Sequence, residues 1–156
     1  MQRFAVISAL FGFTLVASIA LAAPFTYEND RFGTSATFPS DIFSQEQAPP
    51  ENGDGLRWLS DDGASLAIFG SYNVLDETPK TREAAAKAEK DRSVTYSRTG
   101  KNWVVLSGND GDQVFYERYV FGPTDIVHGI VIEYPASLKA KYDPLVGRIA
   151  GSLHGP

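Results

Sequence analysis

Two long runs of mostly apolar residues lie close together in "QVFYERYVFGPTDIVHGIVIEY" (residues 113–134). Successive side chains of a β-strand point to opposite faces, and here both sets are apolar. In the first run Phe115 and Tyr119 alternate with Val114 and Tyr116. The Gly-Pro-Thr-Asp between the runs is typical of a turn. A strand that is apolar on both sides must be covered on both sides, so this hairpin predicts the centre of a sheet between two layers.

Turn residues divide the rest of the chain into further strands. Residues 25–43 predict a short strand, a turn and a second strand that ends at Pro39. "LRWLS" and "ASLAIFGSY" flank Asp62-Gly63, a strong hairpin signal. Residues 94–106 read as two strands joined at residues 100–102, and the polar residues 44–55 form the longest loop.

Two helices are expected. The first covers residues 78–92, where Thr78 can cap and Pro79 suits the first helical position. The second is expected to start at Pro144, with Asp143 as its cap. This helix carries an apolar stripe at helical spacing, formed by Leu145, Val146, Ile149 and Leu153.

These elements predict an α+β fold, an antiparallel sheet of about seven strands with one helix on each face. Their order, two hairpins, a helix, four strands and a helix, resembles the PsbP-like fold. That fold is shared by an extrinsic subunit of the photosynthetic oxygen-evolving complex and a Ran-binding nuclear transport factor.

Two short stretches resemble a group of exported bacterial proteins to which no catalytic activity is assigned. The group carries Tyr-x-Asn-x-Arg-Phe-Gly, an aromatic-Pro pair, and Asn-Gly-Asp-Gly followed by an aromatic residue and Asp-Gly. The matching residues are Tyr27, Asn29, Arg31, Phe32, Gly33, Phe38, Pro39, Asn52, Gly53, Asp54, Gly55, Trp58, Asp62 and Gly63. The resemblance covers about residues 27–75 and implies export and fold rather than an activity.

The N-terminus has the features of a signal peptide. Arg3 precedes the uncharged apolar residues 4–19, and Ala20-Leu21-Ala22 gives the small residues of a cleavage site. The apolar run is short for a membrane span, which needs about 20 residues. We therefore expect residues 1–22 to be removed, residues 23–156 to form a single domain without stable membrane insertion, and the protein to be periplasmic or secreted.

Composition excludes several classes of function. The chain has no cysteine, so disulfides, thiol nucleophiles and cysteine-bound metals are absent. Its 19 Asp and Glu residues outnumber 14 Lys and Arg residues, for a formal net charge of −5. An acidic chain without a basic cluster is a poor match for nucleic acid.

Three residues could support hydrolysis. His128 lies in a predicted strand and would act as general base with Glu117 or Glu133. The more common role of a strand histidine is structural, and nothing in the spacing selects a carboxylate partner. An envelope hydrolase that uses these residues stays open as the alternative function.

The acidic stretch "ENGDGLRWLSDDGASL" (residues 51–66) raises the question of a cation site. It lacks the spacing and the closing glutamate of an EF-hand loop. We interpret it as turn chemistry, in which the glycines supply positive φ and Asp54, Asp61 and Asp62 bond their own backbone or face water. No metal or other cofactor is predicted.

The sequence therefore favours a non-enzymatic binding or assembly module of the cell envelope. Its partner would be an envelope protein or a small ligand. The expected contact surface is formed by the long loop and the ends of the sheet, with Arg31, Asn52, Asp54 and Arg57 as candidate contact residues.

Overall fold

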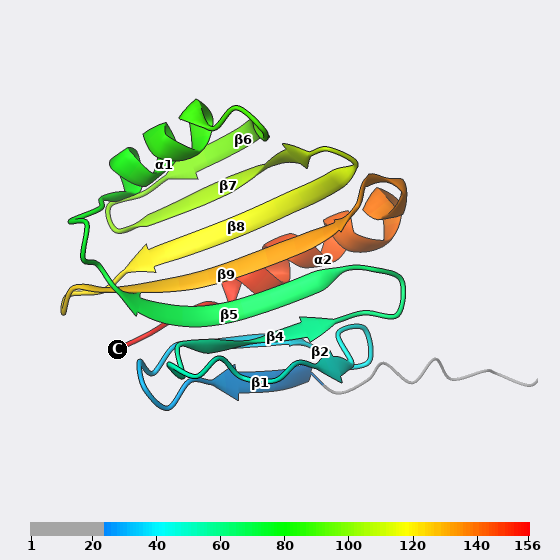
Figure 1. The fold of residues 1–156 in the computed structure, drawn as a ribbon, viewed down its shortest axis with the longest axis horizontal. Coiled ribbons are helices and arrows are strands. Elements are labelled where there is room, and N and C mark those ends of the chain that lie inside the picture. The colour runs from blue at the N-terminus through cyan, green and yellow to red at the C-terminus, as the bar shows by residue number, and fades with distance from the viewer. Residues whose placement is uncertain (1–23) are drawn as a thin grey trace, which may run out of the picture.

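The computed structural model describes residues 24–156, so the predicted signal peptide lies outside the described residues. A seven-stranded antiparallel sheet has the order β3-β4-β5-β9-β8-β7-β6, and β1 and β2 form a separate two-stranded sheet (Figure 1). The strands are β1 (Pro24–Glu28), β2 (Ser35–Pro39), β3 (Gln45–Glu46), β4 (Gly55–Leu59), β5 (Ser65–Tyr72), β6 (Ser93–Thr99), β7 (Trp103–Asp110), β8 (Gln113–Phe121) and β9 (Ile126–Pro135). The helices are α1 (Pro79–Ala88), the 3-10 turn η1 (Ala136–Leu138) and α2 (Lys139–Gly151). No helix within residues 24–156 combines the length and apolar character needed to cross a bilayer.

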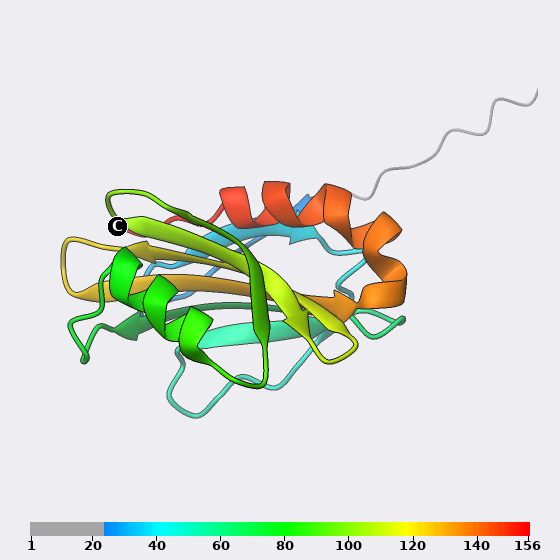
Figure 2. The same ribbon diagram turned by 90° about the horizontal axis from the view of Figure 1, so that it is seen from above.

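The predicted hairpin at 113–134 forms two neighbouring strands in the middle of the sheet, β8 and β9. Its alternation sends Val114 and Ile130 to one face and Phe115 and Tyr119 to the other, and all four are buried. Helix α2 packs on the first face, which we call the α2 face, and α1 packs on the second, the α1 face (Figure 2). The predicted α+β fold with a helix on each face is confirmed.

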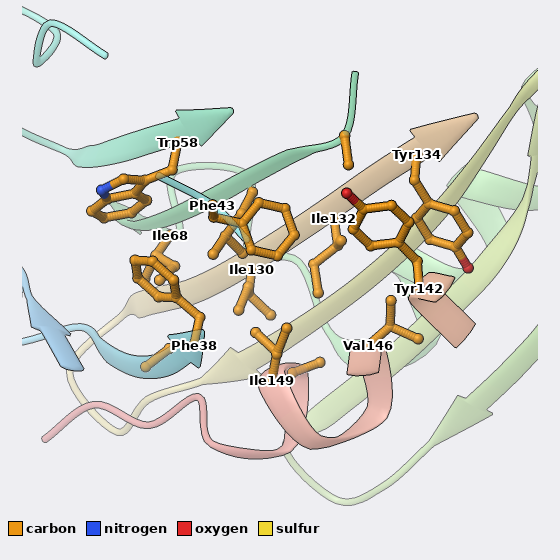
Figure 3. Packing of buried hydrophobic residues seen from close by; sticks show 14 of the residues in the cluster. Phe38, Phe43, Trp58, Ile68, Ile130, Ile132, Tyr134, Tyr142, Val146 and Ile149 are labelled. Carbon is orange, nitrogen blue, oxygen red and sulfur yellow. The ribbon is translucent and has the colours of Figure 1, made fainter. Parts of the chain in front are cut away.

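The larger core lies on the α2 face. Aromatic and branched side chains from the β1–β2 hairpin, the sheet and α2 interlock there (Figure 3). Phe38 lies 4.7 Å from Trp58 between ring centroids, and Tyr134 stacks on Tyr142 at 5.1 Å. Burial of these large rings is the main stabilising term for a domain without disulfides.

Helix α1 begins as predicted and ends early. The Thr78 side chain accepts a hydrogen bond from the backbone N–H of Thr81, and Pro79 is the first helical residue. The helix stops at Ala88, not at residue 92, because Glu89 is already extended and β6 begins at Ser93. Ala86 is buried against the smaller core of the α1 face.

The predicted start of α2 is wrong. The helix begins at Lys139, which places Asp143 and Pro144 inside it. Asp143 does not cap, because its carboxylate accepts a hydrogen bond of 2.7 Å from the hydroxyl of Tyr134. The earlier start adds the fully buried Tyr142 to the stripe, of which Val146, Ile149 and Leu153 are buried as expected and Leu145 is partly buried.

Two details of the N-terminal half also differ from expectation. The first hairpin pairs as predicted, but it lies on the α2 face instead of extending the main sheet. The predicted loop 44–55 contains the two-residue edge strand β3, which pairs with Leu59 and Trp58 of β4. Short edge strands limit the backbone left free for pairing with other chains.

Candidate functional site

A hollow of about 560 Å³ lies on the α1 face, over β4 and β5. Helix α1 packs on this same face but at the other end of the sheet, over β6 and β7. Figure 2 shows the connection between β3 and β4 projecting from the same side of the sheet as α1. This connection, residues 47–54, supplies the roof of the hollow, and we call it the roof loop. The size falls within the range of roughly 300–1,000 Å³ that is typical of ligand pockets.

The floor of the hollow centres on Phe69 of β5. Phe69 pairs with Gly55 on one neighbouring strand and with Gly129 on the other. A Cβ atom at position 129 would lie 2.3 Å from Cζ of Phe69, so the ring occupies the space above that glycine. The ring then meets Tyr119 edge to face, with centroids 6.3 Å apart. These contacts hold Phe69 in place and leave it only partly buried.

The roof loop is held by the turn that joins β1 to β2. The side-chain amide of Asn29 donates to the carbonyl of Gly53 at 2.9 Å, and Asn29 is itself buried. The guanidinium of Arg31 donates to the carbonyl of Asn52 and pairs with Asp54 at 2.8 Å. Gly53 has φ = 65°, a left-handed conformation that glycine adopts without strain. The β1–β2 turn and residues 52–54 therefore meet and fix the roof.

The structure divides the four predicted contact residues between two roles. Arg31, Asn52 and Asp54 come together, and they bond mainly to one another. Arg57 lies apart from them on β4, where it lines the hollow and is exposed. Within residues 24–156 its side chain forms no ion pair and no hydrogen bond. Arg57 is thus a cation at the hollow with its donors free for a ligand.

Sequence reasoning missed the apolar residues of the site. Ala67 and Phe69 line the floor, and Ala48 and Pro50 line the roof. One signal was available, because glycine within a strand often marks a close approach of another group. Gly129 has that role here.

A smaller hollow of about 200 Å³ adjoins the first and shares Phe69. Arg82 of α1 lies over the Tyr119 ring there, 4.2 Å from its centroid. Burial, with the nearby Glu117 carboxylate, raises the pKa of Tyr119 to about 12, so its hydroxyl stays protonated at neutral pH. Val74 and Leu75 are largely exposed at the edge of this hollow.

The structure does not bring His128 together with either glutamate. His128 pairs with Gly70 and Val120 and lies on the α2 face, where it is 1% exposed and its Nδ1 lies 2.7 Å from the Thr34 hydroxyl. Burial lowers the pKa of His128 and favours the neutral ring. Its Nε2 is buried and has no hydrogen-bond partner within residues 24–156.

Both glutamates belong to the α1 face. Glu117 is buried, accepts a hydrogen bond of 2.7 Å from Arg92 and a second of 3.2 Å from the Tyr119 hydroxyl. Glu133 accepts from the hydroxyl of Ser65 at 3.3 Å. The sheet separates these carboxylates from the imidazole. Neither glutamate can therefore reach His128 by a hydrogen bond, as a His–Glu general base would require.

The acidic stretch 51–66 forms turns that are tied to the rest of the fold. Gly63 has φ = 91° in the β4–β5 hairpin, as expected, but Gly55 is required for close packing against β5 and not for positive φ. Asp62 differs from the prediction, because its carboxylate accepts hydrogen bonds from Lys141 and from Tyr142 of α2. These bonds hold the pKa of Asp62 well below its usual value. Among residues 24–156 no three His, Cys, Asp or Glu side chains gather as a metal site would require.

Comparison with known proteins supports the fold alone. No protein-family model matches the chain, and no curated protein matches it. Among solved structures, the chain is similar to the solution structure of cyanobacterial PsbP (CyanoP) from Synechocystis sp. PCC 6803. The TM-score is 0.54 at 13% sequence identity, over 90% of this chain and 97% of that one. The fold is therefore PsbP-like, as the order of elements predicted.

Proposed function

We propose that the protein is an exported, non-enzymatic binding or assembly module of the cell envelope, and that the hollow under the roof loop is its binding surface. Export is supported by Arg3, the apolar residues 4–19 and the Ala20-Leu21-Ala22 site. The resemblance of residues 27–75 to exported bacterial proteins points the same way. The protein would act in the periplasm or outside the cell.

The binding role is supported by the structure of the hollow. Its apolar floor is fixed by neighbouring strands, and its roof is fixed by Asn29 and Arg31. A site that is already formed needs little ordering when a ligand binds, which favours affinity. The hollow contains a free guanidinium. The two candidate catalytic groups lie elsewhere and are buried, with His128 Nδ1 beside the Thr34 hydroxyl and Glu117 bonded to Arg92. These features suit recognition better than covalent chemistry.

A photo-crosslinking experiment tests the binding role. A photoreactive phenylalanine analogue replaces Ala48 in the roof, and in a second protein it replaces the exposed Asp110 at the far β7–β8 turn. After irradiation of intact cells, we expect a covalent adduct only at position 48, detected by a mass shift. The adduct should disappear when Ala67→Leu fills the hollow.

Equal labelling at the two positions would contradict the proposal, as would labelling at position 48 that survives Ala67→Leu. A circular dichroism melt of Ala67→Leu serves as the control for folding. Loss of the adduct counts only in a variant whose melting temperature stays close to that of the wild type.

A further inference from the structure

We infer that the hollow under the roof loop binds a small carboxylate attached to an apolar body, with Arg57 holding the carboxylate and Phe69 supporting the body. This inference rests on the proposed binding role and adds the chemical class of the ligand. It follows from the charge of the lining and from the arrangement of polar and apolar groups around the space.

The carboxylate half of the inference comes from Arg57. Two charged side chains line the hollow, Asp54 and Arg57, and Arg31 reaches Asp54 from the β1–β2 turn. Arg31 and Asp54 pair with each other at 2.8 Å, and Asn52 donates a further hydrogen bond to Asp54 at 2.5 Å. Their charges offset each other, so the charge left for a ligand is the positive charge of Arg57. A guanidinium matches the two oxygens of a carboxylate with parallel hydrogen bonds.

The apolar half comes from the floor and the roof. Ala67 pairs directly with Arg57 across the β4–β5 ladder, and Phe69 follows two residues later on the same face. Ala48 and Pro50 lie opposite in the roof loop. A ligand whose carboxylate meets Arg57 can therefore place an adjacent ring or branched chain between Phe69 and the roof. Burial of such a body contributes roughly 25 cal/mol per Å² of apolar surface.

The charges around the two hollows decide which end takes the carboxylate. The hollow of about 560 Å³ is closed on one side by the roof loop, which is pinned to the β1–β2 turn. It ends at Phe69, beyond which the second hollow is lined by Glu77 as well as Arg82, and these two pair at 3.4 Å. The arginine of the second hollow, Arg82, is already paired with Glu77, so the carboxylate is assigned to the Arg57 end of the first hollow.

The test compares three probes that share one body: 3-phenylpropionate, 3-phenylpropan-1-ol and 3-phenylpropan-1-amine. NMR titration of the purified, isotope-labelled protein gives a Kd for each probe and locates it by chemical-shift changes. We expect the carboxylate to bind about three- to fivefold more tightly than the alcohol, the gain typical of an ion pair to an exposed guanidinium. The amine should bind more weakly than the alcohol, and the shifts should centre on residues 47–57 and 67–69.

Variants separate charge from shape. Arg57→Gln should reduce carboxylate affinity to that of the alcohol and leave alcohol binding unchanged. Lys101→Gln, which removes an exposed positive charge at the β6–β7 turn, should change neither. Ala67→Leu should weaken all three probes, because it fills the space they share.

Several results would overturn the inference: no binding of the carboxylate, amine binding as tight as carboxylate binding, or an Arg57→Gln variant that keeps the preference. If the carboxylate and the alcohol bind equally and Ala67→Leu abolishes both, the carboxylate assignment is wrong while a binding hollow remains. The crosslinking experiment judges the binding role independently of these probes.

Discussion

The ring of Phe69 occupies the space in which a side chain at Gly129 would lie. These two residues face each other across the β5–β9 ladder, and a Cβ at position 129 would come within 2.3 Å of the ring. The absence of a side chain on the central strand thus fixes the position of the aromatic floor of the hollow.

Gly129→Ala is therefore expected to displace Phe69 and to destabilise the fold by about 1–3 kcal/mol, the usual cost of overpacking. Denaturant melts measure the change. Gly147→Ala is the matched control, because Gly147 lies in α2 and nothing within 4 Å would meet its Cβ. That substitution should stabilise the protein by about 0.5–1 kcal/mol, as alanine does in a helix. Equal effects in the two variants would mean that Phe69 does not depend on Gly129.

Glu83 should make stability dependent on pH. Hydrogen bonds from Lys87 first, and then from Ser97 and Thr99 of β6, lower the pKa of Glu83 from 4.5 to about 2. Because the folded pKa is depressed, the carboxylate stabilises the fold fully above pH 4.5, and the contribution is lost as the pH falls through about 2.

We expect Glu83→Gln to be less stable than the wild type by about 1 kcal/mol at pH 7. The difference should shrink as the pH falls from 4.5 toward 2, as measured by urea melts across this range. Glu28→Gln, at an exposed position in β1, should match the wild type throughout. A Glu83→Gln difference that stays constant down to pH 2 would show that the carboxylate titrates normally.

Ile149→Ala tests the packing of α2. Ile149 is 2% exposed and belongs to the core of the α2 face (Figure 3). Its truncation should cost about 2–5 kcal/mol through lost burial and a cavity. The exposed neighbour Arg148→Ala should cost less than about 0.5 kcal/mol. A loss below about 1 kcal/mol for Ile149→Ala would mean that the stripe is poorly packed.

Gly63→Val should lower the melting temperature more than Asp61→Ala. Gly63 has φ = 91°, which a β-branched residue adopts only with strain, whereas Asp61 accepts one exposed hydrogen bond from Gln45. Millimolar calcium should leave the wild-type melting temperature unchanged. A calcium-dependent rise that vanishes in Asp54→Ala would identify a cation site in the acidic stretch.

Export predicts a shorter mature chain. N-terminal sequencing of protein recovered from the periplasm or the medium should begin at Ala23, after cleavage behind Ala22. Recovery of the full-length chain in the membrane fraction would contradict the proposal.

Local patterns were sufficient to predict most of the fold. The two apolar faces of residues 113–134 predicted strands inside the sheet that are covered on both faces. β8 and β9 lie there, between the cores of the α2 face and the α1 face. The start of α2 was misplaced because Asp143-Pro144 has the local signature of a helix start. Tertiary contacts decide otherwise, since Tyr134 binds Asp143 and stacks on Tyr142, and the helix already begins at Lys139.

The candidate site was less accessible to sequence reasoning. The hollow depends on the path of the roof loop, and that path is set by Asn29 and Arg31, which lie more than twenty residues before the backbone they hold. The long loop and the sheet ends predict Arg31, Asn52 and Asp54 as contact residues, but their bonds support the roof. Arg57 belongs to the same predicted surface, and the strand alternation of β4 places it at the hollow.

The position of β9 bears on when the protein can fold. It is the last strand in the sequence, yet it lies between β5 and β8, so the two halves of the sheet cannot join until it is present. During synthesis β5 has no partner on its β9 side until α1 and three further strands, β6 to β8, have been made. For the export proposed above, this order would keep the chain open for longer, because the ribosome releases the joining strand late and the sheet cannot close before then.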